Sequence, residues 1–373
     1  MEKMNRKIVL LEPFLTGSHQ QWATQMQRFS RHDIEILSLP GRHWKWRMHG
    51  AAVTLANAFQ RLSHRPDLII ATDMLDLSTF LGLTKQQTST IPVAIYFHEN
   101  QLTYPWSPTD PDTTLRRNNQ YSFINYTSAL AADAVLFNSA FHKASFLSAL
   151  EAFLRRFPDF KNLETIDLIR QKSEVLPLGL NLTELQQTNP SRSEHPGTVL
   201  WNHRWEYDKN PDAFFEALQQ LQDEQIDFRL IVVGKSYNKQ PKIFEQIPQL
   251  FERELLHFGY AKSRAEYRRL LWQADILPVT SKQDFFGISV VEAIFCNCFP
   301  ILPKRLAYEE HIPEPHQSKH FYDQDGDFYP FLKRSLERID TIRNQTYQTY
   351  VEHYDWSSMI EHYDQLWETI INS

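Results

Sequence analysis

Short apolar runs alternate along the chain with longer segments of helical periodicity. This alternation predicts parallel strands joined by helices, because a strand buried on both faces reads as a continuous apolar run. The pattern occurs twice. The first set of predicted strands is Lys7–Glu12, Asp33–Leu39, Asp67–Ala71, Val93–Phe97, Ala134–Phe137 and Glu174–Leu176, and the second is Thr198–Asn202, Phe228–Val233, Asp275–Val279 and Cys298–Leu302. The predicted helices are 19–30, 50–63, 112–132, 141–157, 211–222, 263–273 and 289–296.

A polar stretch with two prolines, residues 186–197, separates the two sets and predicts an interdomain linker. We therefore expect an α/β protein with one Rossmann-like, doubly wound domain over residues 1–185 and another over 198–345. The chain length of 373 residues fits two domains. The aromatic-rich segment 346–373 is predicted to form a C-terminal helix that packs back across both domains.

Composition narrows the class of protein. Hydrophobic residues make up 42% and charged residues 23%, which is typical of a globular protein and excludes disordered and collagen-like chains. No run reaches the roughly 18 apolar residues of a membrane helix, and the polar N-terminus lacks a signal-peptide pattern. We therefore expect a cytoplasmic protein without a membrane span. The net charge of −6 gives no overall basic field, so a nucleic acid would need a local patch.

Other common site types are not supported by the sequence. The two cysteines, Cys296 and Cys298, lack the spacing of a zinc site, and we expect them to be buried, reduced thiols. Neither a G-x-G-x-x-G nor a Walker A pattern occurs, which argues against a dinucleotide dehydrogenase or a P-loop NTPase.

Four loops after predicted strands carry polar residues, and ligands of open α/β sheets bind at such strand ends. The first loop turns at Gly17 into a predicted helix whose free N–H groups suit an anion. An ordinary turn capped by Ser18 is the alternative.

The second loop places four polar side chains in succession: His98, Glu99, Asn100 and Gln101. Packing explains such a run poorly, and His98 and Glu99 suit the binding of sugar hydroxyls or proton transfer. A zinc role for His98 is not expected, because no H-E-x-x-H helix accompanies it. An inert surface loop is the alternative.

The third loop puts two cations, Arg204 and Lys209, beside a predicted helix N-terminus. Such an arrangement holds a diphosphate without a metal ion, although exposed surface charges are the alternative.

The fourth loop carries the carboxylates Asp284 and Glu292 on either side of Gly287. Glycine lets the backbone approach a ligand, and the N–H groups of Ile288 and Ser289 can point at a phosphate. A capped helix with an exposed aspartate is the alternative.

Together these loops resemble the nucleotide-sugar site of the retaining family-4 glycosyltransferases of GT-B architecture. The resemblance rests on the run Arg204–Lys209 and on the spacing Asp284-x-Phe286-Gly287-x4-Glu292. Supporting residues follow in order: Gly17, Asn138-Ser139, Pro177–Gly179, Gly234, Gly259 and Ala274-Asp275. More narrowly, the strings Phe97–Pro105, Trp201–Glu206 and Asp284–Ser289 resemble the tRNA-queuosine α-mannosyltransferase family, the glycosyltransferase-like domain-containing family. This resemblance covers nearly the whole chain and implies two Rossmann-like domains that face a central cleft.

The resemblance also implies roles. Arg204 and Lys209 would neutralise the leaving diphosphate, Glu292 would bind the nucleotide ribose, and His98 would lie near the donor sugar and the acceptor. Asp284 would contact the donor sugar, although glutamate is usual at its position and reaches one methylene further. The implied catalytic residues are His98, Arg204, Lys209 and Asp284, and the implied donor-binding residues are Gly17, Asn202, Arg204, Lys209, Gly234, Gly287, Ile288, Ser289 and Glu292. Ser18, Glu99, Asn100 and Gln101 would bind the acceptor. The donor would be GDP-mannose, and neither a catalytic base nor a metal cofactor would be required.

An RNA acceptor requires a basic surface, and residues 41–50 offer one. This segment interleaves Arg42, Lys45 and Arg47 with Trp44 and Trp46, which suits phosphate contact and base stacking. A helix-entry loop with buried tryptophans is the alternative. We expect the segment to bind tRNA, and Arg116 and Arg117 to extend it.

Three hypotheses compete. The first is transfer of mannose from GDP-mannose to queuosine in tRNA. The second retains the GT-B fold but uses another nucleotide sugar and a lipid or glycan acceptor; no convincing amphipathic basic helix supports a membrane acceptor. The third is a binding module without catalysis, which the presence of Arg204, Lys209 and Glu292 disfavours. The sequence does not indicate the oligomeric state.

Overall fold

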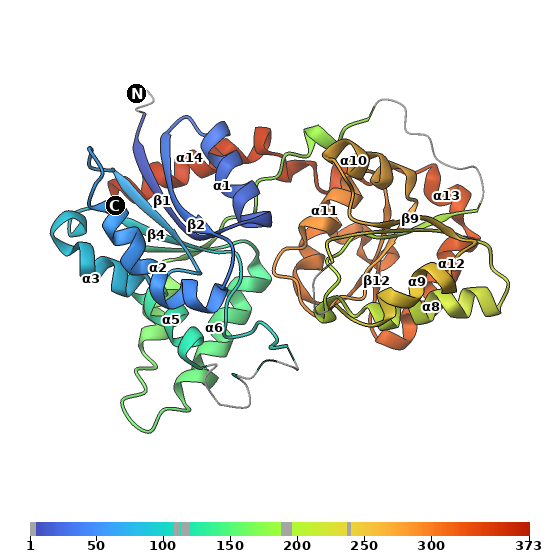
Figure 1. Ribbon diagram of the computed structural model, residues 1–373, viewed down its shortest axis with the longest axis horizontal. Helices are drawn as coiled ribbons and strands as arrows, with labels where there is room; N and C mark the ends of the chain where they lie inside the picture. Colours follow the sequence, from blue (N-terminus) through green and yellow to red (C-terminus); the bar gives the residue numbers. More distant parts are fainter. Residues whose placement is uncertain (1–4, 108–109, 111, 113–118, 188–195, 237–239) are drawn as a thin grey trace. The chain divides into compact units, whose positions relative to one another are not determined.

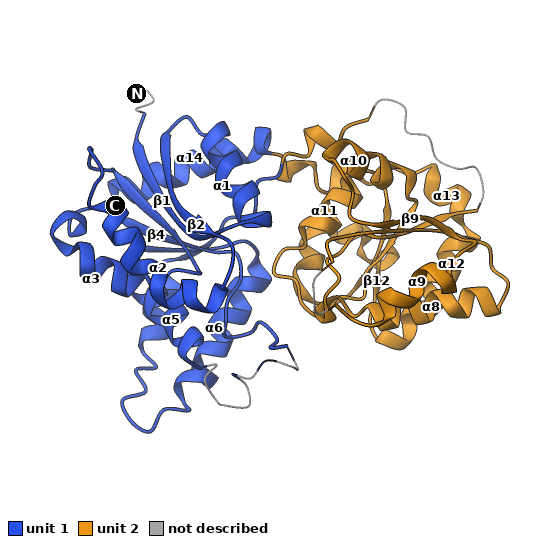
Figure 2. Ribbon diagram, in the orientation of Figure 1, with its two compact units in different colours: residues 1–180, 356–373 blue, residues 181–355 orange. Residues whose placement is uncertain are grey.

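The computed structural model describes residues 5–107, 110, 112, 119–187, 196–236 and 240–373. The chain folds into two compact units, each built on its own parallel sheet (Figure 2). Unit 1 comprises residues 1–180 and 356–373, and unit 2 comprises residues 181–355. The predicted linker therefore lies within the range of unit 2, and most of it, 188–195, lies outside the described residues.

The described part of unit 1 forms a six-stranded parallel sheet with the order β2-β1-β3-β4-β5-β6. Its strands are β1 (Lys7–Leu15), β2 (Asp33–Pro40), β3 (Leu68–Thr72), β4 (Val93–Phe97), β5 (Ala134–Phe137) and β6 (Ser173–Val175). β3 and β4 are buried throughout, as their apolar runs predict. The strand order reverses between β1 and β3, so the loops after β1, β3 and β4 meet at the carboxyl edge of the sheet.

Helices cover both faces of this sheet. α1 (Gly17–Phe29) and the C-terminal α14 (Trp356–Asn372) pack together over one face (Figure 1). α2 (Trp44–Phe59), α3 (Leu77–Thr88) and α5 (Asn119–Ala131) pack together over the other, and α6 (Ala140–Leu154) and α7 (Thr165–Gln171) follow along the chain. α14 is fixed to unit 1 by Tyr363, whose hydroxyl accepts the Trp22 Nε1–H at 3.0 Å and donates to the Pro177 carbonyl at 2.8 Å.

Unit 2 repeats the architecture, with the described strands in the order β12-β11-β10-β7-β8-β9. They are β7 (Thr198–Trp201), β8 (Arg229–Val233), β9 (Leu255–Gly259), β10 (Ile276–Pro278), β11 (Phe299–Pro303) and β12 (Phe321–Tyr322). The helices are α8 (Pro211–Asp223), α9 (Ile243–Leu250), α10 (Arg264–Gln273), α11 (Ile288–Phe295), α12 (Phe328–Glu337) and α13 (Ile339–Arg343). The order reverses between β7 and β10, which brings their following loops together.

Some predicted elements differ from the structure. The helix predicted at 50–63 begins at Trp44, so residues 44–50 of the basic segment lie in α2, whereas Arg42 precedes the helix. β9 was not predicted, because its run Leu255–Gly259 is short, is interrupted by His257 and ends in glycine. Ser18 does not cap α1: the N-cap is Thr16, and Ser18 lies exposed in the first turn.

Two further expectations can be compared with the structure. Cys296 and Cys298 are buried and free of disulfide bonds, as expected. Among the described residues, no helix combines the length and the apolar character needed to cross a membrane.

Candidate active site

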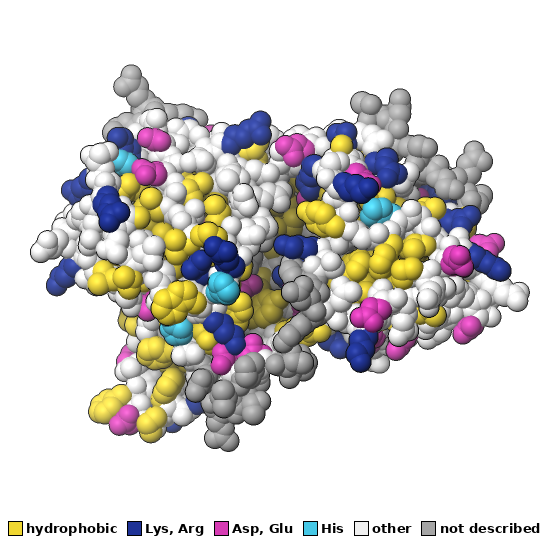
Figure 3. Space-filling model, viewed as in Figure 1, with side chains coloured by type: hydrophobic (Ala, Val, Ile, Leu, Met, Phe, Trp, Pro, Cys, Tyr) yellow, Lys and Arg dark blue, Asp and Glu magenta, His cyan; other side chains and the backbone are white. Residues whose placement is uncertain are grey.

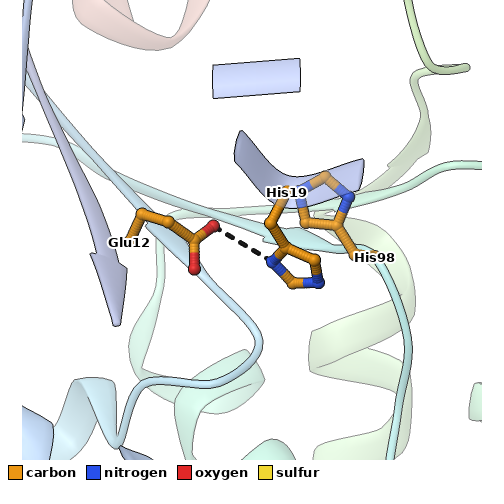
Figure 4. A group of neighbouring side chains, drawn as sticks. All are labelled: Glu12, His19 and His98. Carbon is orange, nitrogen blue, oxygen red and sulfur yellow. Dashed lines mark hydrogen bonds and ion pairs between the residues drawn. The ribbon is translucent and has the colours of Figure 1, made fainter. Parts of the chain in front are cut away.

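Polar and charged side chains gather at the carboxyl edge of each sheet, where the strand order reverses. In unit 1 the cluster begins with Glu12 at the end of β1, His19 in α1 and His98 directly after β4 (Figure 4). The Glu12 carboxylate is fully buried; its Oε2 lies 3.1 Å from Nδ1 of His19, and its Oε1 accepts the Phe14 backbone N–H at 2.8 Å. The rings of His19 and His98 lie 4.2 Å apart. A register shift of β1 against β2 between Glu12 and Leu15 shapes this strand end.

His19 carries a positive charge at neutral pH. Burial opposes its protonation, but the Glu12 carboxylate, together with Asp73 and Glu99, raises the pKa of His19 to about 9. Asp73 follows β3 and is 1% exposed; its Oδ1 accepts the His98 backbone N–H at 2.8 Å. Burial, with the nearby charge of Glu99, raises the pKa of Asp73 to about 8, although the His19 cation lowers it.

His98 is the neutral member of the cluster. Burial, together with the His19 cation, holds the pKa of His98 well below its ordinary value. Its ring packs on Trp22 and Tyr96, with ring centroids 4.7 and 4.9 Å away. Its Nε2 is buried and has no hydrogen-bond partner among the described residues. A buried nitrogen of this kind is suited to a ligand hydroxyl.

Among the described residues, Glu12, His19 and His98 are also the group whose ligand atoms lie close enough together, within 4.8 Å, to hold a metal ion. The contact with Glu12 favours the imidazolium form of His19, and a protonated imidazole does not bind a metal.

The residues after β4 make different contacts. Asn100 builds the loop, because its Oδ1 accepts the backbone N–H groups of Leu102 and Thr103, each at 3.0 Å. Its Nδ2 is buried without a hydrogen-bond partner among the described atoms. Gln101 is buried and donates to Oε1 of Glu99 at 3.0 Å, and Glu99 is partly exposed. Gly17 and Ser18 are exposed at the start of α1.

The basic segment at the start of α2 adjoins this edge of unit 1. Trp44 packs on Trp106 and Tyr121, with ring centroids 5.8 and 5.1 Å away, and belongs to an apolar cluster that includes Phe14 and Met74. Phe14 lies two residues after Glu12 in β1, and Met74 directly follows Asp73. The segment is therefore tied to the site loops through Trp44.

The other side chains of the segment differ in solvent exposure and in ion pairing. Trp46 is 64% exposed, Arg42 is exposed and Arg47 is partly exposed. Figure 3 shows basic and histidine side chains beside hydrophobic ones over this part of α2. Lys45 instead pairs with Asp110 at 2.6 Å and with Asp112 at 2.5 Å. Arg116 and Arg117 lie outside the described residues.

In unit 2, Lys209 and Asp284 form a buried ion pair between the loops that follow β7 and β10. The Lys209 Nζ donates to Asp284 Oδ1 at 2.8 Å and to the Gln283 carbonyl at 2.6 Å, and it lies 3.2 Å from Asp208 Oδ2. The hydroxyl of Tyr308 donates to the second oxygen of Asp284. Burial alone would raise the pKa of Asp284, but Lys209 lowers it below its usual value, so both groups are ionised.

His203 and Asn202 join the β7 loop to the start of α11. Ser289 Oγ lies 3.0 Å from Nδ1 of His203, and Asn202 Nδ2 donates to the Ser289 carbonyl at 2.7 Å. Burial, together with the Lys209 and Arg204 cations, lowers the pKa of His203 to about 4, so it is neutral.

Glu292 in α11 is 5% exposed and held by two residues of α10. Its Oε1 accepts from Arg264 and its Oε2 from the Tyr267 hydroxyl, each at 2.8 Å. The carboxylate is therefore fixed in orientation.

Two glycines shape the loops of unit 2. A Cβ at Gly234 would lie 2.1 Å from the His203 backbone oxygen, so only glycine fits this close approach. Gly287 has φ of +89° and caps α11, in a conformation that favours glycine; Ile288 is the first residue of the helix. Arg204, with a side chain 48% exposed, pairs with Glu206 at 3.2 Å.

The structure thus brings Asn202, Lys209, Asp284, Ser289 and Glu292 to one edge of unit 2, and His98 to Gln101 with Gly17 and Ser18 to one edge of unit 1. Sequence reasoning missed Glu12, His19, Asp73, His203, Arg264, Tyr267 and Tyr308. Asp73 directly follows the end of β3, and this position at a strand end could have identified it as a site residue. Nothing in the sequence marked Arg264 and Tyr267 as site residues, because they lie in a different helix from Glu292 and no sequence spacing links the two helices.

Comparison with known proteins assigns both halves of the chain. A family model described as tRNA-queuosine alpha-mannosyltransferase N-terminal matches residues 7–180, and one described as Glycosyl transferases group 1 matches residues 184–315. A tRNA-queuosine α-mannosyltransferase of Drosophila melanogaster is 36% identical over 316 residues, which cover 82% of each chain. A GDP-mannose:cellobiosyl-diphosphopolyprenol α-mannosyltransferase of Xanthomonas oryzae is 23% identical over 189 residues, covering 49% of this chain and 50% of that protein.

Solved structures support the predicted fold class. A sucrose-phosphate synthase of Thermosynechococcus elongatus superposes with a TM-score of 0.72 at 14% identity and covers 99% of this chain and 100% of its own. A glycosyltransferase of Rickettsia africae gives 0.68 at 14% identity, with 98% and 99% covered. The Anabaena protein HepE in complex with UDP gives 0.64 at 15% identity, with 97% and 100% covered. Such identities show the fold alone, and they confirm the prediction of a GT-B protein with two Rossmann-like units.

Proposed function

The chain belongs to the tRNA-queuosine α-mannosyltransferase family, and from this membership we propose that it transfers mannose from GDP-mannose to queuosine in tRNA with retention of the anomeric configuration. The observation that carries the proposal is the 36% identity to the Drosophila enzyme, over an alignment longer than either unit. The group 1 glycosyltransferase match agrees that the chain is a glycosyltransferase.

The charged loops of unit 2 support a nucleotide-sugar donor. The Arg204 side chain is half-exposed, so it can be the first residue to contact the donor diphosphate. Lys209 donates two of its three N–H groups to Asp284 and Gln283, so the third can contact the diphosphate without breaking these hydrogen bonds. The backbone from Gly287 to Ser289 at the start of α11 suits the same phosphates.

We propose that no metal cofactor is needed, because Arg204 and Lys209 supply the positive charge that a divalent metal supplies in other transferases. Positive charge placed beside a leaving diphosphate stabilises the charge that develops as the sugar bond breaks. The acceptor reacts on the same face of the sugar, and the leaving phosphate assists its deprotonation. Added EDTA should therefore leave the transfer rate unchanged.

The remaining proposed donor contacts are made by side chains that hydrogen bonds hold in place. Glu292, oriented by Arg264 and Tyr267, is proposed to bind the ribose hydroxyls of the nucleotide. Asp284, held between Lys209 and Tyr308, is proposed to contact the donor sugar. The name of the Xanthomonas relative gives GDP-mannose as its donor, which supports the same donor here.

We propose that the acceptor binds to unit 1, and the match of its range to the N-terminal family model supports this. His98 is proposed to lie at the donor sugar and the acceptor, with Ser18, Glu99, Asn100 and Gln101 around the acceptor. Arg42, Trp46 and Arg47 are proposed to hold the RNA through phosphate contacts and stacking. Lys45 contributes less, because two aspartates already neutralise it. A tRNA acceptor favours a cytoplasmic reaction.

A lipid-linked acceptor is the second candidate. The Xanthomonas relative supports it, because its name gives a polyprenol diphosphate as acceptor, but the match covers only half of each chain.

The test incubates the protein with GDP-mannose and tRNA, digests the tRNA and analyses the nucleosides by mass spectrometry. Queuosine should gain one hexose, and tRNA that lacks queuosine should gain none. UDP-glucose in place of GDP-mannose, and a polyprenol-linked glycan in place of tRNA, serve as controls. Hexose on the glycan but not on queuosine would instead establish the second candidate.

A further inference from the structure

The cluster in unit 1 carries more negative than positive charge. Among its described residues, the single cation His19 faces the carboxylates of Glu12, Asp73 and Glu99. Glu12 contacts His19 directly, so the charge of that cation is largely compensated by one carboxylate. Glu99 adds negative potential at the same edge of the sheet, and Asp73, with its pKa raised to about 8, adds more when a bound cation favours its ionised form.

This charge is held in place by the fold. Asp73 is 1% exposed and fixed by the backbone N–H of His98, the residue that precedes Glu99. Glu99 is partly exposed and receives the Gln101 amide at 3.0 Å. A cation bound at the partly exposed Glu99 also favours ionisation of the buried Asp73, whose charge then strengthens the attraction.

Buried polar atoms beside these carboxylates point independently to a ligand. His98 Nε2 and Asn100 Nδ2 are both more than nine-tenths buried, and neither has a hydrogen-bond partner among the described residues. The His98 ring lies 4.2 Å from the His19 ring, inside the cluster (Figure 4). A hydroxyl-bearing cation would satisfy both the charge and these orphan atoms.

We propose that Glu99, reinforced by Asp73, binds the protonated amine of the queuosine side chain, while His98 and Asn100 bind its hydroxyls. This inference rests on the proposed function. Queuosine carries a secondary alkylamine, which is protonated at neutral pH as lysine is, next to a cyclopentene diol. Burial, together with the charge of Glu99, raises the pKa of Asp73, so a bound cation would favour its carboxylate form.

The test compares the binding of queuosine-containing tRNA with that of the same tRNA carrying guanine at that position. Both RNAs offer the same phosphates, so the ratio of their dissociation constants isolates the side chain. Glu99→Gln and Asp73→Asn keep the oxygens that accept from Gln101 and His98 but remove the charge. Glu151→Gln, an exposed carboxylate of α6 paired with Arg155, is the matched control.

The parent should prefer the queuosine tRNA by at least about tenfold, since hydrogen bonds to charged groups are strong. Glu99→Gln and Asp73→Asn should bring the ratio close to one without weakening the guanine tRNA, and Glu151→Gln should keep it. A parent ratio near one, or equal losses for both RNAs, would overturn the proposal. So would a ratio that depends on added zinc or on EDTA, because the cluster would then be a metal site. Mannose transfer by the parent, measured in parallel, tests the proposed function separately.

Discussion

Nδ1 of His19 lies 3.1 Å from Oε2 of Glu12, and both side chains are buried at the carboxyl edge of the unit 1 sheet. This contact fixes a positive charge beside His98, and burial together with that charge lowers the pKa of His98, so that its ring is neutral. The pair thus sets the protonation states of the cluster proposed to receive the acceptor.

The first prediction concerns the titration of His19. Its pKa in the folded protein, about 9, lies above the unfolded value of 6.5. The contact therefore stabilises unit 1 fully below about pH 6.5, and the contribution is lost as the pH rises through 9. The difference corresponds to about 3 kcal/mol, at about 1.4 kcal/mol per pH unit. Glu12→Gln should lower the His19 pKa by at least about one unit, as measured by NMR of the imidazole nitrogens.

The control for this titration is Glu35→Gln, because Glu35 lies 3.8 Å from another histidine, His64. It should leave the His19 titration unchanged. A His19 that titrates near 6.5 in the parent would contradict the account.

The second prediction separates the two cations of unit 2. Arg204→Ala should lower kcat by about 10²–10³-fold, because it removes charge stabilisation at the leaving diphosphate. Its effect on Tm should be small, because the side chain is half-exposed. Lys209→Ala should also lower kcat, and it should lower Tm by roughly 10 °C, because it leaves Asp208 and Asp284 uncompensated in the interior. Steady-state kinetics and thermal unfolding measure the two effects.

The structure therefore predicts that Arg204→Ala, unlike Lys209→Ala, spares the fold. Equal Tm losses for the two variants would show that the Lys209 contacts do not stabilise unit 2.

The third prediction concerns the close approach at Gly234. A Cβ there would lie 2.1 Å from the His203 carbonyl oxygen, so Gly234→Ala must displace the loop after β7. It should cost about 1–3 kcal/mol and lower Tm by roughly 2–10 °C. Gly82→Ala is the matched control: it lies in α3 with open space around it, and it should stabilise unit 1 by about 0.5–1 kcal/mol. Thermal unfolding of both variants provides the measurement, and similar shifts would refute the steric argument.

The fourth prediction concerns the start of α2. Replacing Arg42 and Arg47 by glutamine should reduce the slope of log K against log salt by about 1.4–1.8, at 0.7–0.9 for each phosphate contact. Lys45→Gln should change the slope less, because Asp110 and Asp112 already pair with Lys45. Trp46→Ala should weaken binding by about 1–3 kcal/mol if it loses a stacked base. Filter binding over a salt series tests this, and unchanged slopes would place the RNA elsewhere.

The sequence predicts most of the sheets because β3, β4 and β8 are apolar runs that the fold buries. The strand-end loops were identifiable for the same reason. The contact of His19 with Glu12 was not, because it depends on how α1 packs on β1 rather than on any local spacing. Likewise, no sequence pattern indicates that Lys209 pairs with Asp284, since ion pairing between loops is a property of the folded chain.

The most direct test of the central claim is the identity of the linkage formed on tRNA. After incubation with GDP-mannose, the tRNA is digested to nucleosides, which are treated with α- or β-mannosidase and analysed by mass spectrometry. The account predicts a queuosine bearing one hexose, which α-mannosidase but not β-mannosidase returns to queuosine. Queuosine without a hexose, or a hexose released by β-mannosidase, would contradict retaining transfer of mannose to queuosine.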